Sequence, residues 1–454
     1  MKQGAPEQPL KRFKRLILRN AGNDWEHTFY RDAMMQALLG NLPLVTQAYQ
    51  PAIHYINGEY WGLINIRERY DEFYFESHFD IDPSDLVILS AIHTGDVDVK
   101  AGYHSDLEDF LRVLQYAEEQ DLSQTEHMAW IEERVDLDNL VLHYASQIYF
   151  NNHDWPHNNF DAWRKRTDHY DSEAPMGHDG RWRWLIVDTD FGFGLFSDPS
   201  KNWIEDVMIP GTSWNRSLDI SPFNRLFRAL VHGNKAYRHL FINTMADNLN
   251  SHFYSERIFD MIEEFEERIA SHRDEHNSRW QVQTGPNSLD AFVDERPEAM
   301  RGQIMSTFDL RGTAKLTIIN ESFEHGIIRV NTLNIETNLP GLADRNHPYP
   351  WTGIYFQEVP VILEAFPANG YQFTGWTVTE TPPVNEGSNT GSNFFADPIQ
   401  KLHLSMDTTV TANFQKGNCA YSPTPLNLFW PEEFSIGKAY HTNYAPLIEQ
   451  PTTP

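Results

Sequence analysis

The spacing of apolar residues changes once along this chain, near residue 310, and that change limits the folds open to it. Over about 222–306 apolar residues recur at helical spacing, with acidic faces such as 263–267. After residue 310 the sequence shows short strand patterns, such as 314–319, 326–330 and 359–364, separated by segments rich in Gly, Asn and Pro. The sequence therefore predicts an α+β chain in which a mostly helical part precedes a small all-β module.

Three segments follow from this pattern. The chain has 454 residues, enough for two to four domains at roughly 100–200 residues each. Aromatic residues make up 13% of it, which supports a sizeable core and argues against disorder. We predict a first domain over 1–309, a β-rich domain over 310–416, and an extended Pro-rich tail or linker over 417–454.

The charge of the chain excludes several classes of partner. Its 36 Lys and Arg against 64 Asp and Glu give a net charge of −28, which repels phosphate backbones and anionic lipid. Nucleic acid is therefore not expected as a partner, whereas a basic protein or peptide would be attracted. The single cysteine, Cys419, excludes an internal disulfide framework, and no apolar run approaches the ~18 residues of a membrane span.

The N-terminal segment reads as a strand, a helix and a hairpin. A strand pattern over 12–20 ends in an Asn/Gly turn, and Asp24 is expected to cap a helix over about 26–40. Two strand patterns, 51–56 and 60–67, flank Asn57-Gly58-Glu59, and Asn-Gly is the strongest short-range hairpin signal. A short helix is expected over 71–78.

Four oxygen-bearing side chains carry the clearest chemical signal. A helical region over 104–150 runs into an Asn-rich loop that contains Asp154 and, five residues on, Asn159. A strand over 182–188 then leads to Asp188 and Asp190, followed by Phe-Gly. Such oxygens are hard ligands suited to Mg²⁺ or Mn²⁺. Protein kinases use this set: an Asp that orients the hydroxyl, an Asn that holds a metal, and a strand-end Asp that holds the metals bridging the phosphates.

The order of elements suggests candidate nucleotide contacts. Arg19, on the first strand, takes the position of the lysine that pairs with nucleotide phosphates, with Asp32 on the next helix as its expected partner. Arg67 and Glu68 lie in a polar stretch at the position of a kinase hinge. Surface ion pairs are the alternative for Arg19, Arg67 and Glu68, and the sequence contains no Gly-x-Gly-x-x-Gly loop.

Five ordered runs resemble the spore coat protein H (CotH) kinase family. They are Leu18-Arg-Asn-Ala-Gly-Asn-Asp24, Phe29-Tyr-Arg-Asp32, Ile56-Asn-Gly-Glu-Tyr-Trp-Gly62, Asn152-His-Asp-Trp-Pro-His-Asn-Asn159 and Trp184-Leu-Ile-Val-Asp-Thr-Asp-Phe-Gly192. The resemblance implies an atypical protein-kinase-like fold and a secreted-type enzyme that uses ATP and a divalent metal to phosphorylate serine. It makes Asp154 the catalytic Asp, and Asn159, Asp188 and Asp190 the metal ligands.

The resemblance also implies what should precede this segment. Members of the family normally carry a further N-terminal stretch that completes the small lobe and is not found here, so we expect an incomplete small lobe and a mostly helical large lobe. A signal peptide is likewise not found and is expected to have preceded the chain.

The β-rich part is similar to the small β repeats of bacterial surface proteins, including internalin B-type repeats. Two motifs carry the similarity, Gly370-Tyr-Gln-Phe-Thr-Gly-Trp376 and Asp407-Thr-Thr-Val-Thr-Ala-Asn-Phe414. It implies an extracellular or cell-surface location in a bacterium.

The leading hypothesis is thus a kinase that transfers the γ-phosphate of ATP to Ser or Thr of a basic or Ser-rich protein or peptide. One alternative is an inactive kinase-like scaffold or adhesion module. Another is a metal-dependent hydrolase that uses His153, Asp154, His157 and the strand-end acids, and that would hold zinc.

Overall fold

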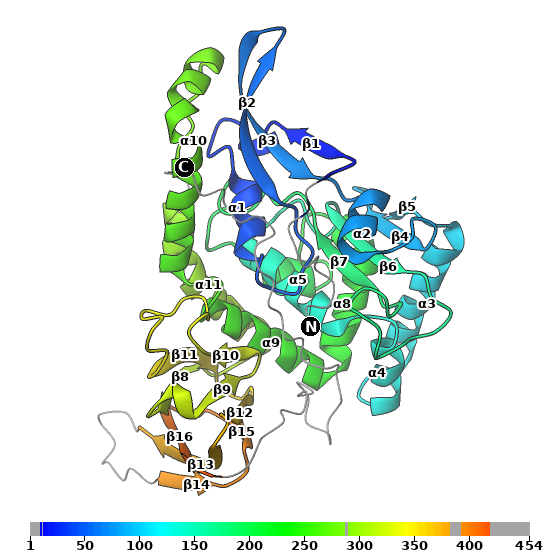
Figure 1. Ribbon diagram of the computed structural model, residues 1–454. Helices are drawn as coiled ribbons and strands as arrows, with labels where there is room; N and C mark the ends of the chain where they lie inside the picture. Colours follow the sequence, from blue (N-terminus) through cyan, green and yellow to red (C-terminus); the bar gives the residue numbers. More distant parts are fainter. Residues whose placement is uncertain (1–9, 11, 287–288, 382–391, 418–454) are drawn as a thin grey trace. The chain divides into compact units, whose positions relative to one another are not determined.

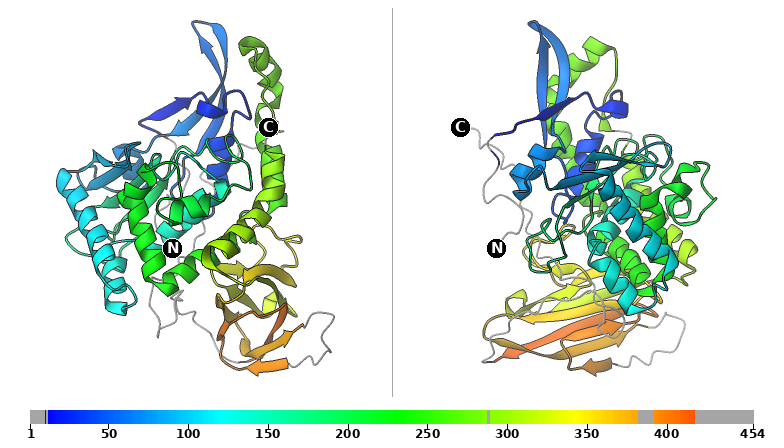
Figure 2. Two further views of the ribbon diagram at one scale, coloured as in Figure 1. Left: turned by 180° about the vertical axis from the view of Figure 1, so that it is seen from behind. Right: turned by 90° about the vertical axis from the view of Figure 1, so that its right-hand side faces the viewer.

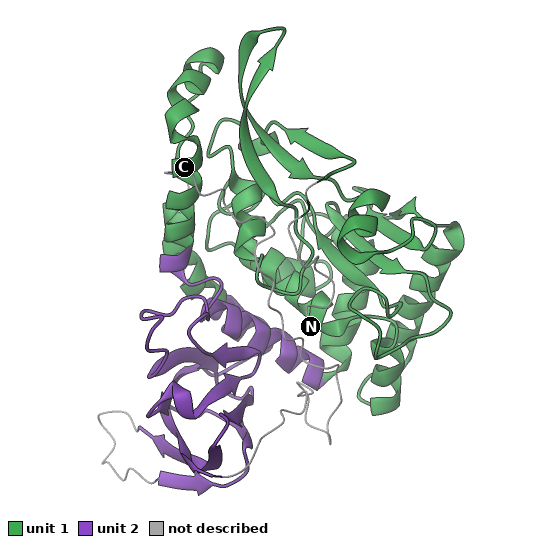
Figure 3. Cartoon of the chain, viewed as in Figure 1, with its two compact units in different colours: residues 1–234, 258–300, 440–454 green, residues 235–257, 301–439 purple. Residues whose placement is uncertain are grey.

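The computed structural model describes residues 10, 12–286, 289–381 and 392–417, and they form two compact units (Figure 3). Among these residues, unit 1 contains those up to Asn234 together with Ile258–Met300. Unit 2 contains Lys235–Arg257 and the residues from Arg301 onward. The fold combines a mostly helical N-terminal region with C-terminal all-β sheets, as the apolar spacing predicts. Residues 418–454 of the predicted tail lie outside the described residues.

The first sheet of unit 1 has the strand order β1-β3-β2 and is antiparallel (Figure 1). Its strands are β1 (Leu16–Arg19), β2 (Tyr49–Ile56) and β3 (Glu59–Glu68). Asn57 and Gly58 join β2 to β3 with positive φ angles of 52° and 81°, which confirms the predicted hairpin.

One long helix, α10 (Ser255–Trp280), supports this hairpin (Figure 1, Figure 2). The amide of Leu63 donates to His276 Nδ1 at 3.0 Å, and Trp280 Nε1 donates to the carbonyl of Trp61 at 2.7 Å. Phe265 stacks on Tyr49 with ring centroids 5.2 Å apart. The hairpin is therefore held against a rigid element.

The second sheet of unit 1 has the strand order β5-β4-β6-β7. Its strands are β4 (Leu86–Ala91), β5 (Val97–Ala101), β6 (Phe160–Lys165) and β7 (Arg183–Ile186). The sequence predicted only β7. All six residues of β4 are buried, so that strand lacks the polar alternation by which a half-exposed strand is recognised.

Helices make up most of the rest of unit 1. They are α1 (Arg31–Leu38), α2 (Glu72–Phe79), α3 (His104–Glu119), α4 (Thr125–Glu132), α5 (Leu137–Phe150), α6 (Trp203–Met208), α7 (Ser217–Ile220), α8 (Pro222–Gly233) and α11 (Asp290–Phe308), whose last residues belong to unit 2. Within the described residues, no helix combines the length and the apolar character needed to cross a membrane.

The expectation that Asp24 caps the first helix is wrong. Helix α1 begins at Arg31, and Asp24 is buried seven residues earlier. Its carboxylate accepts hydrogen bonds from the amides of Thr28 and Arg31 at 3.1 and 2.9 Å, and from Arg31 Nε at 3.0 Å. Asp24 therefore closes a buried loop ahead of the helix. Its carboxylate also forms a buried ion pair with the guanidinium of Arg31.

Unit 2 contains helix α9 (Lys235–Leu249) and two sheets. The strand order is β10-β9-β12-β15 in one sheet and β11-β8-β16-β13-β14 in the other. The strands are β8 (Thr313–Asn320), β9 (Gly326–Val330), β10 (Leu333–Ile335), β11 (Trp351–Phe356), β12 (Val361–Pro367), β13 (Tyr371–Glu380), β14 (Ser392–Phe395), β15 (Ile399–Leu402) and β16 (Thr408–Lys416). The strands predicted over 314–319, 326–330 and 359–364 correspond to β8, β9 and β12.

A buried carboxylate fastens α9 to the strands of unit 2. Asp247 is fully buried and accepts hydrogen bonds from Asn331 Nδ2 at 3.1 Å and from the Tyr355 hydroxyl at 2.9 Å. The amide and hydroxyl of Thr332 donate to its other oxygen at 3.1 and 2.6 Å. Removing this carboxylate would leave the buried donors of Asn331 and Tyr355 without this acceptor, together with the two donors of Thr332.

We expect Asp247→Ala to lower the free energy of unfolding of unit 2 by about 3 kcal/mol, because each orphaned buried donor is costly. Native-state hydrogen exchange at the amides of β9 to β12 in the full chain measures this loss. The control is Glu321→Ala, an exposed acid of the same unit, for which a change within about 0.5 kcal/mol is expected. Equal effects of the two substitutions would contradict the role given to Asp247.

Candidate functional site

The Asn-rich loop that follows α5 is shaped by its own amide side chains. Helix α5 ends at Asn151, which adopts the left-handed conformation with φ 56° and turns the chain. Asn152 is fully buried, and its Nδ2 donates to Gln147 Oε1 at 3.0 Å. Its Oδ1 accepts the amide of Asp154 at 3.2 Å. The loop is thereby anchored on the helix from which it emerges.

Within this loop, Asp154 is oriented by two amides. Its Oδ2 accepts from Asn158 Nδ2 at 2.9 Å and from Asn159 Nδ2 at 2.8 Å. Asn159 donates through its nitrogen, so its Oδ1 remains available to a ligand. Burial raises the pKa of Asp154 above its usual value, and the hydrogen bond from Asn158 opposes that rise.

Asp188 and Asp190 share one guanidinium. Arg19 Nη1 and Nη2 donate to the two oxygens of Asp188 at 3.1 and 2.5 Å, and Nη2 also donates to Asp190 Oδ2 at 2.8 Å. The Asp188 side chain is 30% exposed and that of Asp190 only 2%. Burial, together with the charge of Asp188, raises the pKa of Asp190 to about 7 despite the opposing charge of Arg19.

A turn, rather than the pleat of a strand, brings these two acids to one side. Strand β7 ends at Ile186, and Asp188 has a φ of 38°. Between the acids, the amide and hydroxyl of Thr189 donate to Asp32 Oδ1 at 2.9 and 3.0 Å. The side chain of Thr189 thus bonds Asp32, whereas Asp188 and Asp190 on either side of it bond Arg19.

The loop between β1 and α1 lies directly against Asp190. The amide of Asn23 donates to Asp190 Oδ2 at 3.0 Å, and Asn23 Nδ2 donates to Oδ1 at 3.3 Å. A Cβ atom on Gly22, whose φ is 59°, would lie 2.4 Å from Asp190 Oδ2. Only glycine allows the backbone to approach the acid this closely.

The two groups of acids are connected through Asn152. Its Nδ2 lies 3.5 Å from the backbone carbonyl of Asp188, while its Oδ1 holds the amide of Asp154. The charge of Asp188 also contributes to the raised pKa of Asp154. The structure therefore gives two bonded sets, Asp154 with Asn159 and Asp188 with Asp190, joined by a residue that the sequence analysis did not single out.

Arg67 and Glu68 are both buried and bonded to other groups. Arg67 forms an ion pair with Asp32, and its Nε donates to the carbonyl of Ala48 at 3.2 Å. Glu68 lies 2.7 Å from His78 Nε2 and accepts the amide of Ala48 at 3.0 Å. The expected pairing of Arg19 with Asp32 is wrong, because Arg67 takes Asp32 and the two strand-end acids take Arg19.

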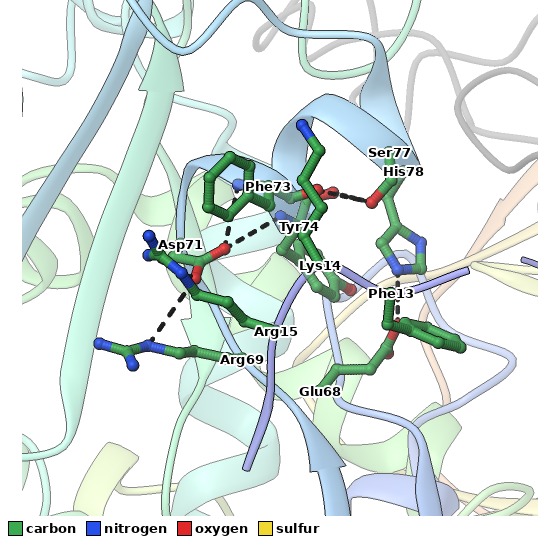
Figure 4. A pocket seen from close by; sticks show the side chains of 10 residues that line it. All are labelled: Phe13, Lys14, Arg15, Glu68, Arg69, Asp71, Phe73, Tyr74, Ser77 and His78. Atoms are coloured by element: carbon green, nitrogen blue, oxygen red, sulfur yellow. Dashed lines mark hydrogen bonds and ion pairs between the residues drawn. The ribbon is translucent and has the colours of Figure 1, made fainter.

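Glu68 also lines a small hollow of about 240 Å³ (Figure 4). Its lining consists of Phe13, Lys14, Arg15, Glu68, Arg69, Asp71, Phe73, Tyr74, Ser77 and His78. The lining includes none of Asp154, Asn159, Asp188 and Asp190. Lys14 and Arg15 lie over the ring of Phe73 and pair with acids of α2 and its N-cap. Two of the cations that line the hollow, Lys14 and Arg15, are therefore already paired with acids.

The histidines of the loop point to different places. The His153 ring stacks on Trp203, with centroids 4.3 Å apart, and its Nε2 lies 3.2 Å from Asn151 Oδ1. His157 Nε2 instead lies 3.8 Å from Asp154 Oδ1. A third histidine, His93, joins Asp154 and His157, so that one ligand atom from each lies within 4.8 Å of the others. The sequence analysis missed His93, which is 61 residues before Asp154.

The donor atoms of the site fit a hard divalent cation. Asp188, Asp190 and Asn159 offer carboxylate and amide oxygens, the ligands that Mg²⁺ and Mn²⁺ prefer. A positive charge, the guanidinium of Arg19, already lies against both carboxylates.

Comparison with known protein families adds an independent finding. Residues 1–301 match the model of the CotH kinase protein family, and residues 351–418 match the divergent InlB B-repeat domain. The second match contains both β-repeat motifs identified in the sequence. A comparison with curated proteins yields no match. The first match covers more than half of the length of this chain, so the chain belongs to the CotH kinase protein family.

Proposed function

We propose that this protein is an atypical protein kinase that transfers the γ-phosphoryl group of ATP to a Ser or Thr hydroxyl of a partner protein, with Mg²⁺ or Mn²⁺ required. The observation that carries the proposal is the arrangement of Asp154 with Asn159 beside Asp188 with Asp190, linked by Asn152. Membership of the CotH kinase family supports it.

In this proposal Asp154 is the catalytic base. Asn158 and Asn159 hold Oδ2, which leaves Oδ1 to orient the substrate hydroxyl and to accept its proton. The hydroxyl oxygen forms a bond to the γ-phosphorus as the bond to the departing ADP oxygen breaks. Desolvation of Asp154, which raises its pKa, makes the carboxylate a better proton acceptor.

Asn159, Asp188 and Asp190 would hold the metal, and Arg19 would donate to phosphate oxygens of ATP. Bound Mg²⁺ or Mn²⁺ supplies positive charge that neutralises the phosphates. Arg67 acts indirectly, because it pairs with Asp32, which in turn holds Thr189 between the two acids. Glu68 lies at the end of β3, at the position of a kinase hinge, and we place it there as a neighbour of the nucleotide.

The proposal extends to architecture and location. The first domain, over 1–309, would have a kinase-like fold, followed by the β domain over 310–416. The B-repeat match supports a role at a bacterial cell surface. The net charge of −28 favours basic or Ser-rich substrates.

We expect Asp154→Asn to reduce phosphoryl transfer by about 10²–10⁴-fold, the usual contribution of a positioned base. Binding of ATP in the presence of Mn²⁺ should stay unchanged, because this substitution keeps the metal ligands. Autophosphorylation with radiolabelled ATP and calorimetry measure the two quantities separately. Asp168→Asn, an exposed acid of unit 1, is the matched control. Wild-type transfer by Asp154→Asn would refute the role of Asp154.

We expect Asp188→Ala and Asp190→Ala each to abolish the Mn²⁺ dependence of ATP binding, because each removes a metal ligand. Calorimetric titration of ATP with and without Mn²⁺ measures the effect, with Asp168→Ala as the control. If the wild-type chain itself gives no Mn²⁺-dependent heat, it acts as a scaffold or adhesion module and the kinase proposal fails.

The raised pKa of Asp190 predicts a pH dependence of metal binding. Below about pH 7 the carboxyl keeps its proton, and an arriving ion must displace it, so Mn²⁺ affinity should fall by about tenfold per pH unit. Above that pH the affinity should level off. Calorimetry in two buffers of different ionisation enthalpy should detect about one proton released per ion at low pH. Equal affinity from about pH 5 to about pH 8 would contradict this assignment.

A further inference from the structure

His93, Asp154 and His157 come together because of how strands β4 and β6 pair. The two strands are antiparallel, with Ser90 opposite Asp161. The end of β4 therefore lies beside the beginning of β6. His93 follows the end of β4 closely, and His157 precedes the start of β6 closely. Both rings therefore lie at the same end of these two strands, with centroids 6.1 Å apart. The pairing of β4 with β6 thus brings His93 to the loop that contains both Asp154 and His157.

His157 is a buried side chain whose polar atoms lack partners. Its side chain is 9% exposed, and Nδ1 is buried without a hydrogen bond. Nε2 has Asp154 Oδ1 at 3.8 Å, beyond hydrogen-bond distance. Within the described part of the chain neither nitrogen of this ring is satisfied. Nε2, the nitrogen that faces Asp154, is therefore able to bind a ligand.

The carboxylate of the cluster is held in a matching orientation. Asn158 and Asn159 occupy Asp154 Oδ2, so Oδ1 is the oxygen that faces His157. Metal-binding carboxylates are oriented by hydrogen bonds to neighbouring groups in the same way. His93 is exposed and gives the cluster access to solvent.

The ligand types select a particular class of metal. Two imidazoles and one carboxylate suit Zn²⁺, which binds three protein ligands and a water in open sites, whereas Mg²⁺ and Mn²⁺ prefer oxygen ligands alone. Asp188, Asp190 and Asn159 form the oxygen-only set. The two sets therefore differ in the ion that they favour.

We propose that His93, Asp154 and His157 form a second metal site, specific for Zn²⁺, and that Zn²⁺ bound there inhibits phosphoryl transfer by occupying Asp154 Oδ1. The existence of the site rests on the geometry alone. The inhibition rests on the proposed function, because it requires Asp154 to be the base.

Co²⁺ titration of the full chain tests the site without any measurement of activity. Co²⁺ replaces Zn²⁺ in such sites and absorbs in the visible range when its coordination number is low. We expect one equivalent of Co²⁺ to produce these bands in the wild-type chain, and Zn²⁺ but not Mg²⁺ to remove them. His93→Ala should weaken Co²⁺ binding by more than about tenfold, since it removes a ligand outright.

His93 is the variant of choice because its side chain is exposed, so its removal leaves the core intact. His104→Ala is the matched control, since the His104 side chain is 80% exposed and lies outside the cluster. Bands that are absent from the wild-type chain, or that persist equally in His93→Ala, would overturn the site. Bands lost in both variants would mean binding at scattered surface histidines and would overturn it as well.

A second measurement tests the inhibition. The Zn²⁺ concentration that halves autophosphorylation, with each variant normalised to its own zinc-free rate, should rise more than about tenfold in His93→Ala and stay unchanged in His104→Ala. Equal inhibition of all three proteins would refute inhibition through this site even if Co²⁺ binds there. If the chain has no transferase activity, the proposed function fails, while the Co²⁺ spectra still decide whether the metal site exists.

Discussion

The contact between Arg19 and the pair Asp188 and Asp190 organises the site. It joins a short strand near the start of the described chain to a turn about 170 residues later. Two carboxylates in contact would repel each other, and the guanidinium allows both to remain at the same place. The β1–α1 loop lies at the same contact, since the amide of Asn23 donates to the Asp190 oxygen that Arg19 also bonds and Gly22 lies close to both side chains.

Much of the fold was predictable from local signals. The Asn57-Gly58 hairpin and the strands over 314–319, 326–330 and 359–364 follow from turn residues and apolar spacing. Strand β4 was missed because it is fully buried, and a fully buried strand shows no polar alternation. The start of α1 was misplaced because Asp24 has a typical capping residue type, but its partner Arg31 is revealed only by the folded loop.

The site was predictable to the same degree. The bonded pair of Asp154 and Asn159 lies within one loop, so its spacing alone is informative. The positions of Asn152, Arg19 and His93 in the site were not predicted. They depend on which strands pair and on how turns orient side chains, and a sequence motif contains neither kind of information. Unit 2 gives a parallel case, since helix α9 joins the strands through Asp247, a single acid inside an otherwise ordinary helical pattern.

The shared guanidinium also determines how the protein behaves before any ion arrives. One guanidinium, that of Arg19, is shared by two carboxylates, so the folded chain already carries an internal positive charge beside Asp188 and Asp190. In the proposed kinase, a divalent ion held by these two acids would compete with the guanidinium of Arg19, so its binding would be an exchange between two positive charges.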